Sequence, residues 1–180
     1  MNAKTKRMII ELIAFVLLIV LDQWTKSLAV KYLKDVDYIW LIKGVLQLHY
    51  LPNGNTGAAF GMFAGHQLVF LIIALVVVIV IGYILYRIPT GRKYRLLSIL
   101  LLFIAAGGVG NMIDRAVLNS VIDFIYISII NFPIFNVADI YVSVSTVILA
   151  IVLIFKISED DYKELESEVK APFIRKNKDA

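Results

Sequence analysis

Four stretches of this 180-residue chain are apolar over most of their length, and each is long enough to cross a lipid bilayer. A membrane-spanning helix needs about 20 predominantly apolar residues. The four stretches reach that length at about residues 8–28, 67–87, 96–117 and 136–156. Hydrophobic residues make up 60% of the chain, whereas soluble domains contain roughly 45–50%. We therefore expect an all-α membrane protein with four transmembrane helices.

These four spans leave little room for a separate soluble domain, so we expect one membrane domain over residues 1–157. Its first apolar stretch follows three basic residues, as in a secretory signal peptide. No small-residue cleavage site follows this stretch, so we expect it to remain as a membrane anchor. Residues 158–180 are polar, and we expect this tail to be either a short solvated helix or disordered.

The distribution of basic residues predicts the orientation of the spans, because cytoplasmic loops are enriched in Lys and Arg. If the N-terminus is cytoplasmic, 13 of the 18 basic residues lie on the cytoplasmic side. The outer side then holds only Lys26, Lys31, Lys34, Lys43 and Arg115. We therefore expect both termini and the polar tail to be cytoplasmic. Topology accounts for the net charge of +4, so no nucleic-acid partner is needed to explain it.

Two segments are predicted on the outer side of the membrane. Residues 29–66 include a stretch, residues 38–50, that is rich in the β-branched and aromatic side chains typical of strands. The turn signal Pro-Asn-Gly-Asn follows at residues 52–55. We expect a small β-rich extracytoplasmic segment between the first and second helices. The second outer segment, residues 118–135, is apolar and is expected to lie against the lipid surface.

The polar residues gather near the outer ends of the spans. Polar side chains in a membrane are costly and usually mark a site or a pairing partner. A small transporter or channel subunit, our alternative function, would need charges or broken helices near the bilayer centre, and the sequence supplies no such path. A non-catalytic assembly protein would leave the clustered outer carboxylates without a purpose. The residues that we single out are Asp22, Lys26, Asn55, Gly57, Asn111, Asp114, Arg115, Asp123, Asn136 and Asp139.

Asp123 and Asp139 are candidates for a catalytic pair, because each lies in a hydrophobic sequence, VIDFIYI and FNVADIYV. Two carboxylates about 4 Å apart repel by about 4 kcal/mol at an effective dielectric constant of about 20. Such a pair would hold one proton near neutral pH, and could take a proton from water and give one to a carbonyl oxygen or a leaving nitrogen. Alternatively, each Asp caps a helix or meets an Arg at the interface, which the spacing alone favours.

Two further groups support either a site or simple packing. Asp22 and Lys26 are spaced i, i+4 in the order that favours an ion pair, and Lys26 could equally reach out to water. Residues 55–61, Asn-Thr-Gly-Ala-Ala-Phe-Gly, combine an amide with small side chains. They would let a peptide approach the backbone closely, or let the loop fold tightly onto a helix end.

The third span carries small residues at positions 105–110, which predict close packing against neighbouring helices. Asn111, Asp114 and Arg115 follow within about one helical turn. They could anchor the backbone of a substrate or brace the bundle. We expect Arg115 to pair with a carboxylate.

Other catalytic chemistries lack the residues that they need. The chain has no cysteine, which excludes a thiol nucleophile. Its two histidines, His49 and His66, do not form an HExxH motif, and no GxSxG motif is present. Carboxylates remain as the catalytic groups, and we expect neither a metal nor a cofactor.

Five motifs at the outer ends of the spans, taken in order, resemble those of lipoprotein signal peptidase (signal peptidase II). They cover the chain from about residue 21 to residue 141, and the tail lies outside the resemblance. The motifs are DQWTK with Asp22 and Lys26, NTGAAFG with Asn55 and Gly57, GGVGNMIDR with Asn111, Asp114 and Arg115, VIDF with Asp123, and FNVAD with Asn136 and Asp139.

This resemblance implies a multi-pass aspartic endopeptidase of the bacterial inner membrane, with its active site at the outer face. Such enzymes remove signal peptides from diacylglyceryl-modified prolipoproteins and cut on the amino side of the lipidated cysteine. Asp123 and Asp139 match the catalytic pair, and the other polar residues match positions that shape or support the site. The family is sensitive to the cyclic peptide globomycin, which occupies the same site. The implied partners are prolipoproteins and membrane lipid, and we expect a monomer.

Overall fold

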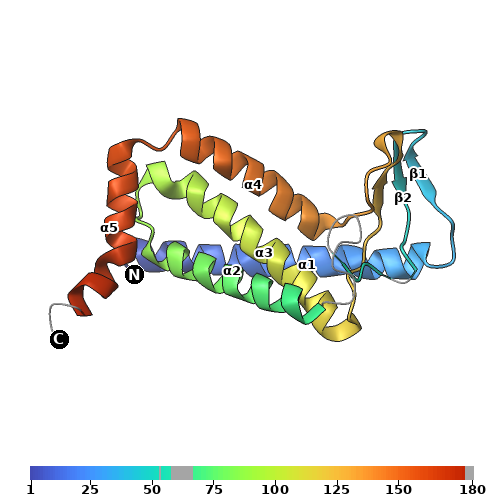
Figure 1. The fold of residues 1–180 in the computed structure, drawn as a ribbon, viewed down its shortest axis with the longest axis horizontal. Coiled ribbons are helices and arrows are strands. Elements are labelled where there is room, and N and C mark those ends of the chain that lie inside the picture. Colours follow the sequence, from blue (N-terminus) through green and yellow to red (C-terminus); the bar gives the residue numbers. More distant parts are fainter. Residues whose placement is uncertain (53, 58–66, 177–180) are drawn as a thin grey trace.

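The computed structural model describes residues 1–52, 54–57 and 67–176, with side chains as far as residue 171. Within these residues, four helices are long and apolar enough to cross a membrane. The elements, in chain order, are α1 (Ala3–Leu33), β1 (Ile39–Ile42), β2 (Leu46–Leu48), α2 (Gln67–Arg87), the 3-10 turn η2 (Arg92–Tyr94), α3 (Arg95–Leu118), β3 (Ile125–Ile127), the 3-10 turn η3 (Ser128–Ile130), α4 (Val137–Phe155) and α5 (Glu159–Lys176). The predicted all-α architecture with four spans is confirmed, and Figure 1 shows the helices as a bundle with the strands at one end.

The observed helix α1 is longer than the predicted first span. It has 31 residues, which at a rise of about 1.5 Å per residue corresponds to roughly 46 Å. The hydrocarbon core of a bilayer is only about 30 Å thick, so the ends of α1 extend beyond it. Hydropathy predicted only the part that fits within lipid, whereas the bounds of the other three spans agree with the prediction to within one residue.

Helix α3 is the central helix of the bundle and packs against α1, α2 and α4. Half of the residues in the most apolar 18-residue stretch of this span are buried, compared with 6% in α1 and 6% in α2. Its small residues make this possible, as predicted. A Cβ atom at Gly107 would lie 2.8 Å from Val142 Cγ2 on α4, and one at Gly110 would collide with the Asp22 carboxylate on α1. Close approach of α3 therefore depends on glycine at both positions.

The three strands form one antiparallel sheet in the order β1-β2-β3. The first two strands come from the outer segment that was predicted to be β-rich. The third, β3, comes from the segment between α3 and α4, where no strand was predicted, and Gln47 pairs with Tyr126 across β2 and β3. Because β2 offers a free edge, the β-branched residues Ile125 and Ile127 can pair with it. The sheet therefore ties together the segment between α1 and α2 and the segment between α3 and α4.

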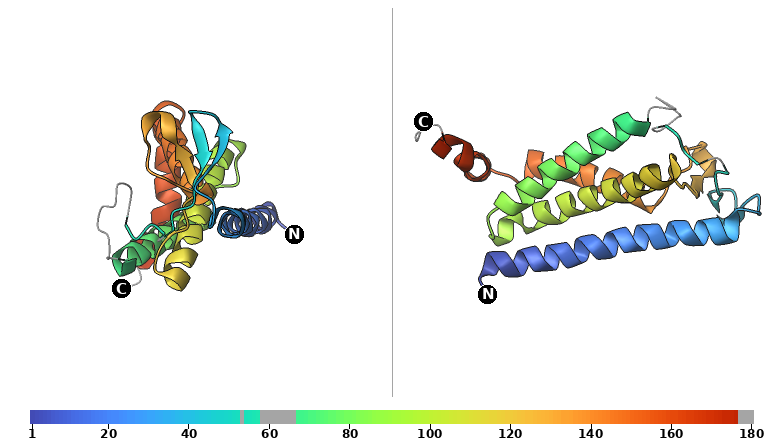
Figure 2. Two further views of the ribbon diagram at one scale, coloured as in Figure 1. Left: turned by 90° about the vertical axis from the view of Figure 1, so that its right-hand side faces the viewer. Right: turned by 90° about the horizontal axis from the view of Figure 1, so that it is seen from below.

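Helix α5 lies at the end of the bundle opposite the sheet (Figures 1 and 2). Within the predicted tail, residues 159–176 are therefore helical, one of the two states that the sequence allowed. Lys93 Nζ lies 2.5 Å from Asp161 Oδ1 and 2.8 Å from Glu164 Oε2, and the Tyr94 hydroxyl donates to Glu164 Oε2 at 2.8 Å. These bonds join α5 to the turn between α2 and α3.

Candidate active site

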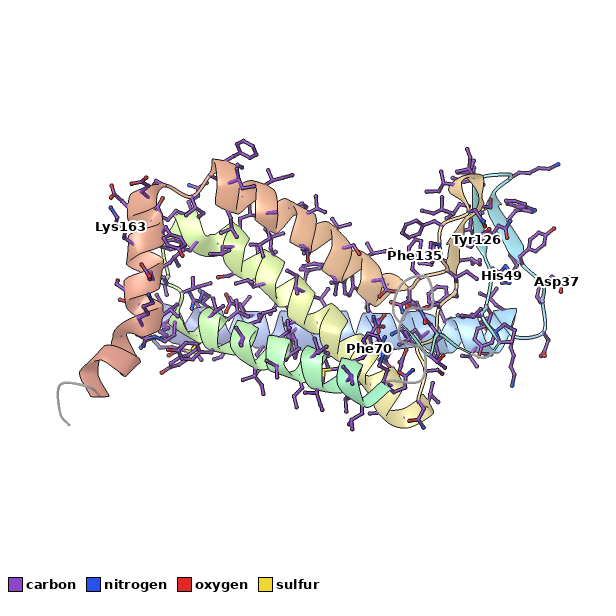
Figure 3. All side chains as sticks on the ribbon, in the orientation of Figure 1. Asp37, His49, Phe70, Tyr126, Phe135 and Lys163 are labelled. Carbon is purple, nitrogen blue, oxygen red and sulfur yellow. The ribbon has the colours of Figure 1, made fainter. Side chains whose placement is uncertain are left out.

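All ten residues that were singled out from the sequence lie at the end of the bundle that carries the sheet. Four segments supply most of them: the second half of α1, the end of α3, the loop before β3 and the start of α4. Asn55 and Gly57 come from the loop before α2, in which residues 58–61 of the predicted small-residue motif lie outside the described residues. Figure 3 marks this end by the labelled side chains His49, Tyr126 and Phe135.

Lys26 lies at the centre of a buried network and is only 1% exposed. Its Nζ atom lies 2.9 Å from Asp22 Oδ2 and 2.9 Å from Asp114 Oδ2. It also donates to Asn111 Oδ1 at 2.9 Å. These three bonds use all three donors of the ammonium group. The predicted ion pair with Asp22 is confirmed, and the alternative that Lys26 reaches water is wrong.

The two carboxylates that flank Lys26 also bind backbone amides and so fix neighbouring segments. Asp22 Oδ1 accepts from the backbone N–H of Ala138 at 2.9 Å, which satisfies one of the free amides at the start of α4. Asp114 Oδ2 accepts from the backbone N–H of Ile122 at 3.1 Å. Because Ile122 and Ala138 lie next to Asp123 and Asp139, this network holds the backbone beside each member of the candidate pair.

Gln23 completes this network, and sequence reasoning missed it. Its side-chain amide donates to Asp114 Oδ1 at 2.9 Å and to the Gly110 carbonyl at 3.1 Å. The residue stands next to Asp22, inside a span, where polar side chains are costly. Its polarity in that setting is the signal that could have identified it.

Asp123 is buried, with 1% of its surface exposed. Asn55 Nδ2 donates to its Oδ2 at 2.9 Å, and Asn136 Nδ2 donates to its Oδ1 at 2.7 Å. Burial raises the pKa of Asp123 from 3.8 to about 7, and the nearby charge of Asp139 adds to this rise. The hydrogen bonds from the two asparagines oppose it. The Asp123 carboxyl therefore exchanges its proton near neutral pH.

Asp139 lies in the first turn of α4 and takes part in its cap. Its Oδ2 accepts from the backbone N–H of Asn136 at 3.1 Å, while its own backbone N–H donates to Asn136 Oδ1 at 3.0 Å. The second oxygen, Oδ1, accepts from Asn111 Nδ2 at 2.8 Å. The predicted helix-capping alternative therefore applies to Oδ2 of Asp139, whereas Oδ1 is bound by the side chain of Asn111.

Asn136 connects the two members of the candidate pair. Its side-chain amide donates to Asp123 and its backbone amide donates to Asp139. It is fully buried, and its Nδ2 also lies 3.1 Å from Asn111 Oδ1. One asparagine therefore fixes both carboxylates relative to each other.

A cavity of about 460 Å³ opens beside the pair and is lined by both Asp123 and Asp139. Its volume is within the range of about 300–1,000 Å³ that is usual for ligand sites. Asn55, Gly57 and Asn111 add polar groups to one wall. The remaining wall is mostly apolar and includes Val121, Ile127, Ile130, Phe132, Pro133, Ile134, Phe135, Ile140 and Val144. In the described part of the chain, no cluster of His, Asp or Glu side chains is arranged as a metal site.

Arg115 also lines this cavity, but it does not pair with a carboxylate as predicted. Its guanidinium donates to the carbonyl of Gly57 at 3.3 Å and lies 5.2 Å from the ring centre of Phe70. It forms no ion pair with any described carboxylate, since the nearby acids already accept from Lys26 and from amides. Its Nε atom is buried without a described partner. Arg115 is therefore held by a carbonyl and an aromatic ring at the edge of the cavity, with its Nε turned away from solvent.

Comparison with known proteins identifies the family. Residues 14–155 match the signal peptidase (SPase) II family. A lipoprotein signal peptidase of Brevibacillus brevis is 43% identical over 73% of this chain and 86% of its own length. One from Clostridium tetani is 40% identical over 86% of this chain and 96% of its own.

Solved structures described as bacterial membrane enzymes share the fold. One has a TM-score of 0.70 and 28% identity, and covers 83% of this chain and 90% of its own. Another has a TM-score of 0.68 and 30% identity, and covers 82% of this chain and 94% of its own. The transporter or channel alternative receives no support from these matches. The five motifs read from the sequence predicted the family correctly: this chain is a multi-pass bacterial membrane protein that belongs to the signal peptidase II family.

Proposed function

We propose that this chain is an aspartic endopeptidase that removes signal peptides from diacylglyceryl-modified prolipoproteins and cuts on the amino side of the lipidated cysteine. The observation that carries the proposal is that Asp123 and Asp139 line one cavity and are both hydrogen-bonded by Asn136. The substrate class is supported by the relatives, which are lipoprotein signal peptidases.

In the proposed mechanism, the pair holds one proton and activates a water molecule directly. The ionised carboxylate takes a proton from water as the oxygen attacks the scissile carbonyl, and the protonated carboxyl gives its proton to the carbonyl oxygen. As the resulting tetrahedral diol collapses, the leaving nitrogen takes a proton from the protonated carboxyl, one diol hydroxyl gives its proton to the ionised carboxylate, and the C–N bond breaks, which restores the singly protonated pair. No acyl-enzyme forms. The pKa of about 7 for Asp123 supports a shared proton, which belongs to the pair and not to one residue.

The other residues of the cavity hold the pair and the substrate. Asn55 and Asn111 each bind one carboxylate. Arg115 also lines the cavity, so its guanidinium could bind a substrate carbonyl. The apolar wall offers a surface for the acyl chains and for the hydrophobic part of the signal peptide.

We further propose that both termini are cytoplasmic and that the site lies at the outer face. The excess of basic residues at the end of the bundle away from the site supports this orientation. A lipidated substrate would then enter sideways from the outer leaflet. Its acyl chains would stay in lipid while the scissile bond reaches the carboxylates at the interface.

The test is cleavage of a diacylglyceryl-modified prolipoprotein by the purified chain in detergent, followed by mass spectrometry. The matched control is the same prolipoprotein with its cysteine replaced by serine, which cannot be lipidated. We expect loss of the signal peptide from the lipidated substrate only, and inhibition by globomycin. Failure to cleave the lipidated substrate, or equal cleavage of both, would refute the proposed substrate class.

A further inference from the structure

A second cavity, of about 580 Å³, lies in a groove between α1 and α3 at the end of the bundle opposite the candidate active site. Figure 2 shows that both helices run away from this end, where the N-terminus also lies. The lining residues are spaced three or four apart, so each helix presents one face to the groove. They include Lys6, Ile10 and Ala14 from α1, and Arg95, Ile99 and Leu102 from α3.

The groove changes from basic to apolar along its length. Lys6 and Arg95 lie at its mouth with Arg92, and Ala14 and Leu102 lie further along the helices. From residue 6 to residue 14, α1 rises about 12 Å. A phospholipid has the same order of groups, with a charged phosphate followed by hydrocarbon. The groove therefore matches the headgroup and upper acyl chain of a lipid in the leaflet at this end.

Three cations at the mouth have no partner within the described residues. Lys6, Arg92 and Arg95 are exposed, and none of their side chains has a hydrogen bond or an ion pair within the described residues. Asp161 and Glu164 of α5 bind the neighbouring Lys93 instead. The mouth therefore carries positive charge that no described acid of the chain neutralises.

The remaining basic residue at the mouth, Arg7, is already occupied. Its guanidinium donates to the carbonyls of Leu85 and Ile88 at 2.9 and 2.8 Å, at the end of α2, and its Nε lies 3.4 Å from Glu11 Oε1. Glu11, the one acid lining the groove in the described part of the chain, is thus paired with Arg7. Arg7 braces the helices, and the three free cations remain for a ligand.

The starts of two helices add to the positive field at the same place. Helices α1 and α3 begin at Ala3 and Arg95, and both of these residues line the cavity. Helix α3 has no side-chain cap at its N-terminus. Asn2 caps α1, and the Arg95 amide donates to the Arg92 carbonyl, so the helix starts contribute the partial positive charge of their macrodipoles and not free amides.

We propose that this groove binds one anionic phospholipid, with its phosphate between Lys6, Arg92 and Arg95 and one acyl chain along the apolar part. Phosphatidylglycerol would be preferred over phosphatidylcholine, because the cationic choline would lie beside the same three cations. The site uses no residue of the candidate active site and does not depend on the proposed peptidase activity.

The test is native mass spectrometry of the purified full chain in detergent, titrated with phosphatidylglycerol or phosphatidylcholine. We expect one phosphatidylglycerol to be retained in preference to phosphatidylcholine. In the double variant Arg92→Gln/Arg95→Gln, phosphatidylglycerol should bind roughly 30-fold more weakly, since each basic residue near an anionic lipid contributes about 1 kcal/mol. Phosphatidylcholine binding should not change.

The matched control is Lys34→Gln/Lys43→Gln, which removes the same charge at the opposite end from two exposed positions. It should keep the preference for phosphatidylglycerol. A second variant, Ala14→Phe, fills the groove without changing charge and should also weaken retention. Equal retention of both lipids by the wild type, equal weakening in both double variants, or displacement of the lipid by equimolar inorganic phosphate would each overturn the proposal.

Discussion

Lys26 shows how a single residue can hold four segments of this protein in place. It is buried against two carboxylates, which bind the backbones of the loop before β3 and of the start of α4. Burying charges is costly unless they are paired, and removing one partner leaves the others uncompensated. We infer that the Lys26 network supports the geometry of the Asp pair without taking part in the chemistry.

Replacing Lys26 with Met should therefore destabilise the protein by about 3–5 kcal/mol, because Asp22 and Asp114 would remain buried without their cation. Thermal unfolding in detergent, followed by circular dichroism, would measure this. The control Lys34→Met changes an exposed lysine and should alter stability by no more than about 0.5 kcal/mol. Equal effects of the two substitutions would contradict the structural role of Lys26.

The pKa of Asp123, about 7, predicts the alkaline limb of activity. The pair needs its shared proton, so kcat/KM should fall as the pH rises through about 7. The Asn55 hydrogen bond favours the charged form of Asp123. In Asn55→Ala, the pKa of Asp123 should rise and the alkaline limb should move to higher pH. A limb that stays in place or moves to lower pH would argue against this assignment.

At the residue scale, the sequence identified most residues of the candidate active site but not all of their hydrogen-bond partners. Hydrophobic flanks identified Asp123 and Asp139, and helical spacing identified the pair of Asp22 and Lys26. The partner of Arg115 could not be predicted, because it depends on which acids other segments have already bound. A carbonyl of the loop before α2 took the place of the expected carboxylate.

At the scale of elements, the helices were predictable because bilayer thickness sets the length of an apolar span. The strand β3 was not, since its three residues owe their conformation to the edge of β2 and not to a local pattern. Likewise, the state of the tail depends on contacts with a distant turn. The strand was therefore missed and the state of the tail was left open, because long-range contacts determine both conformations.

Packing of α3 against α4 gives a prediction for two glycines. A Cβ at Gly107 would press on Val142 and on the backbone of Ala138, so Gly107→Ala should destabilise the bundle by about 1–3 kcal/mol. A Cβ at Gly82 on α2 would meet no described atom within 4 Å, and Gly82→Ala should stabilise by about 0.5–1 kcal/mol through helix propensity. Thermal unfolding in one detergent compares them, and equal shifts would contradict the packing described for α3.

At the scale of the whole molecule, the two ends of the bundle have different roles. The strands and α5 lie at opposite ends of the bundle (Figure 1). The candidate active site is at the end with the strands, and the basic groove is at the end with α5. The family match ends at residue 155, before α5 begins. The bonds between α5 and the turn at Lys93 are largely exposed, and such bonds contribute little stability.

A chain that ends after Lys156 should therefore retain the cleavage rate of the full chain toward a lipidated prolipoprotein, because α5 contributes no residue to the cavity that holds Asp123 and Asp139. The rate can be measured in detergent at matched protein concentration. A large fall in kcat for the shortened chain would link the two ends of the molecule and would contradict this separation.

The central claim is that Asp123 and Asp139 together activate water. Its most direct measurement is the single-turnover cleavage rate of a lipidated prolipoprotein by Asp123→Asn and by Asp139→Asn, with Asp37→Asn as the matched change at an exposed aspartate. Circular dichroism would check that each variant is folded. We expect no detectable cleavage by the first two variants and the wild-type rate for the third. Substantial turnover by a folded Asp123→Asn or Asp139→Asn variant would contradict the account.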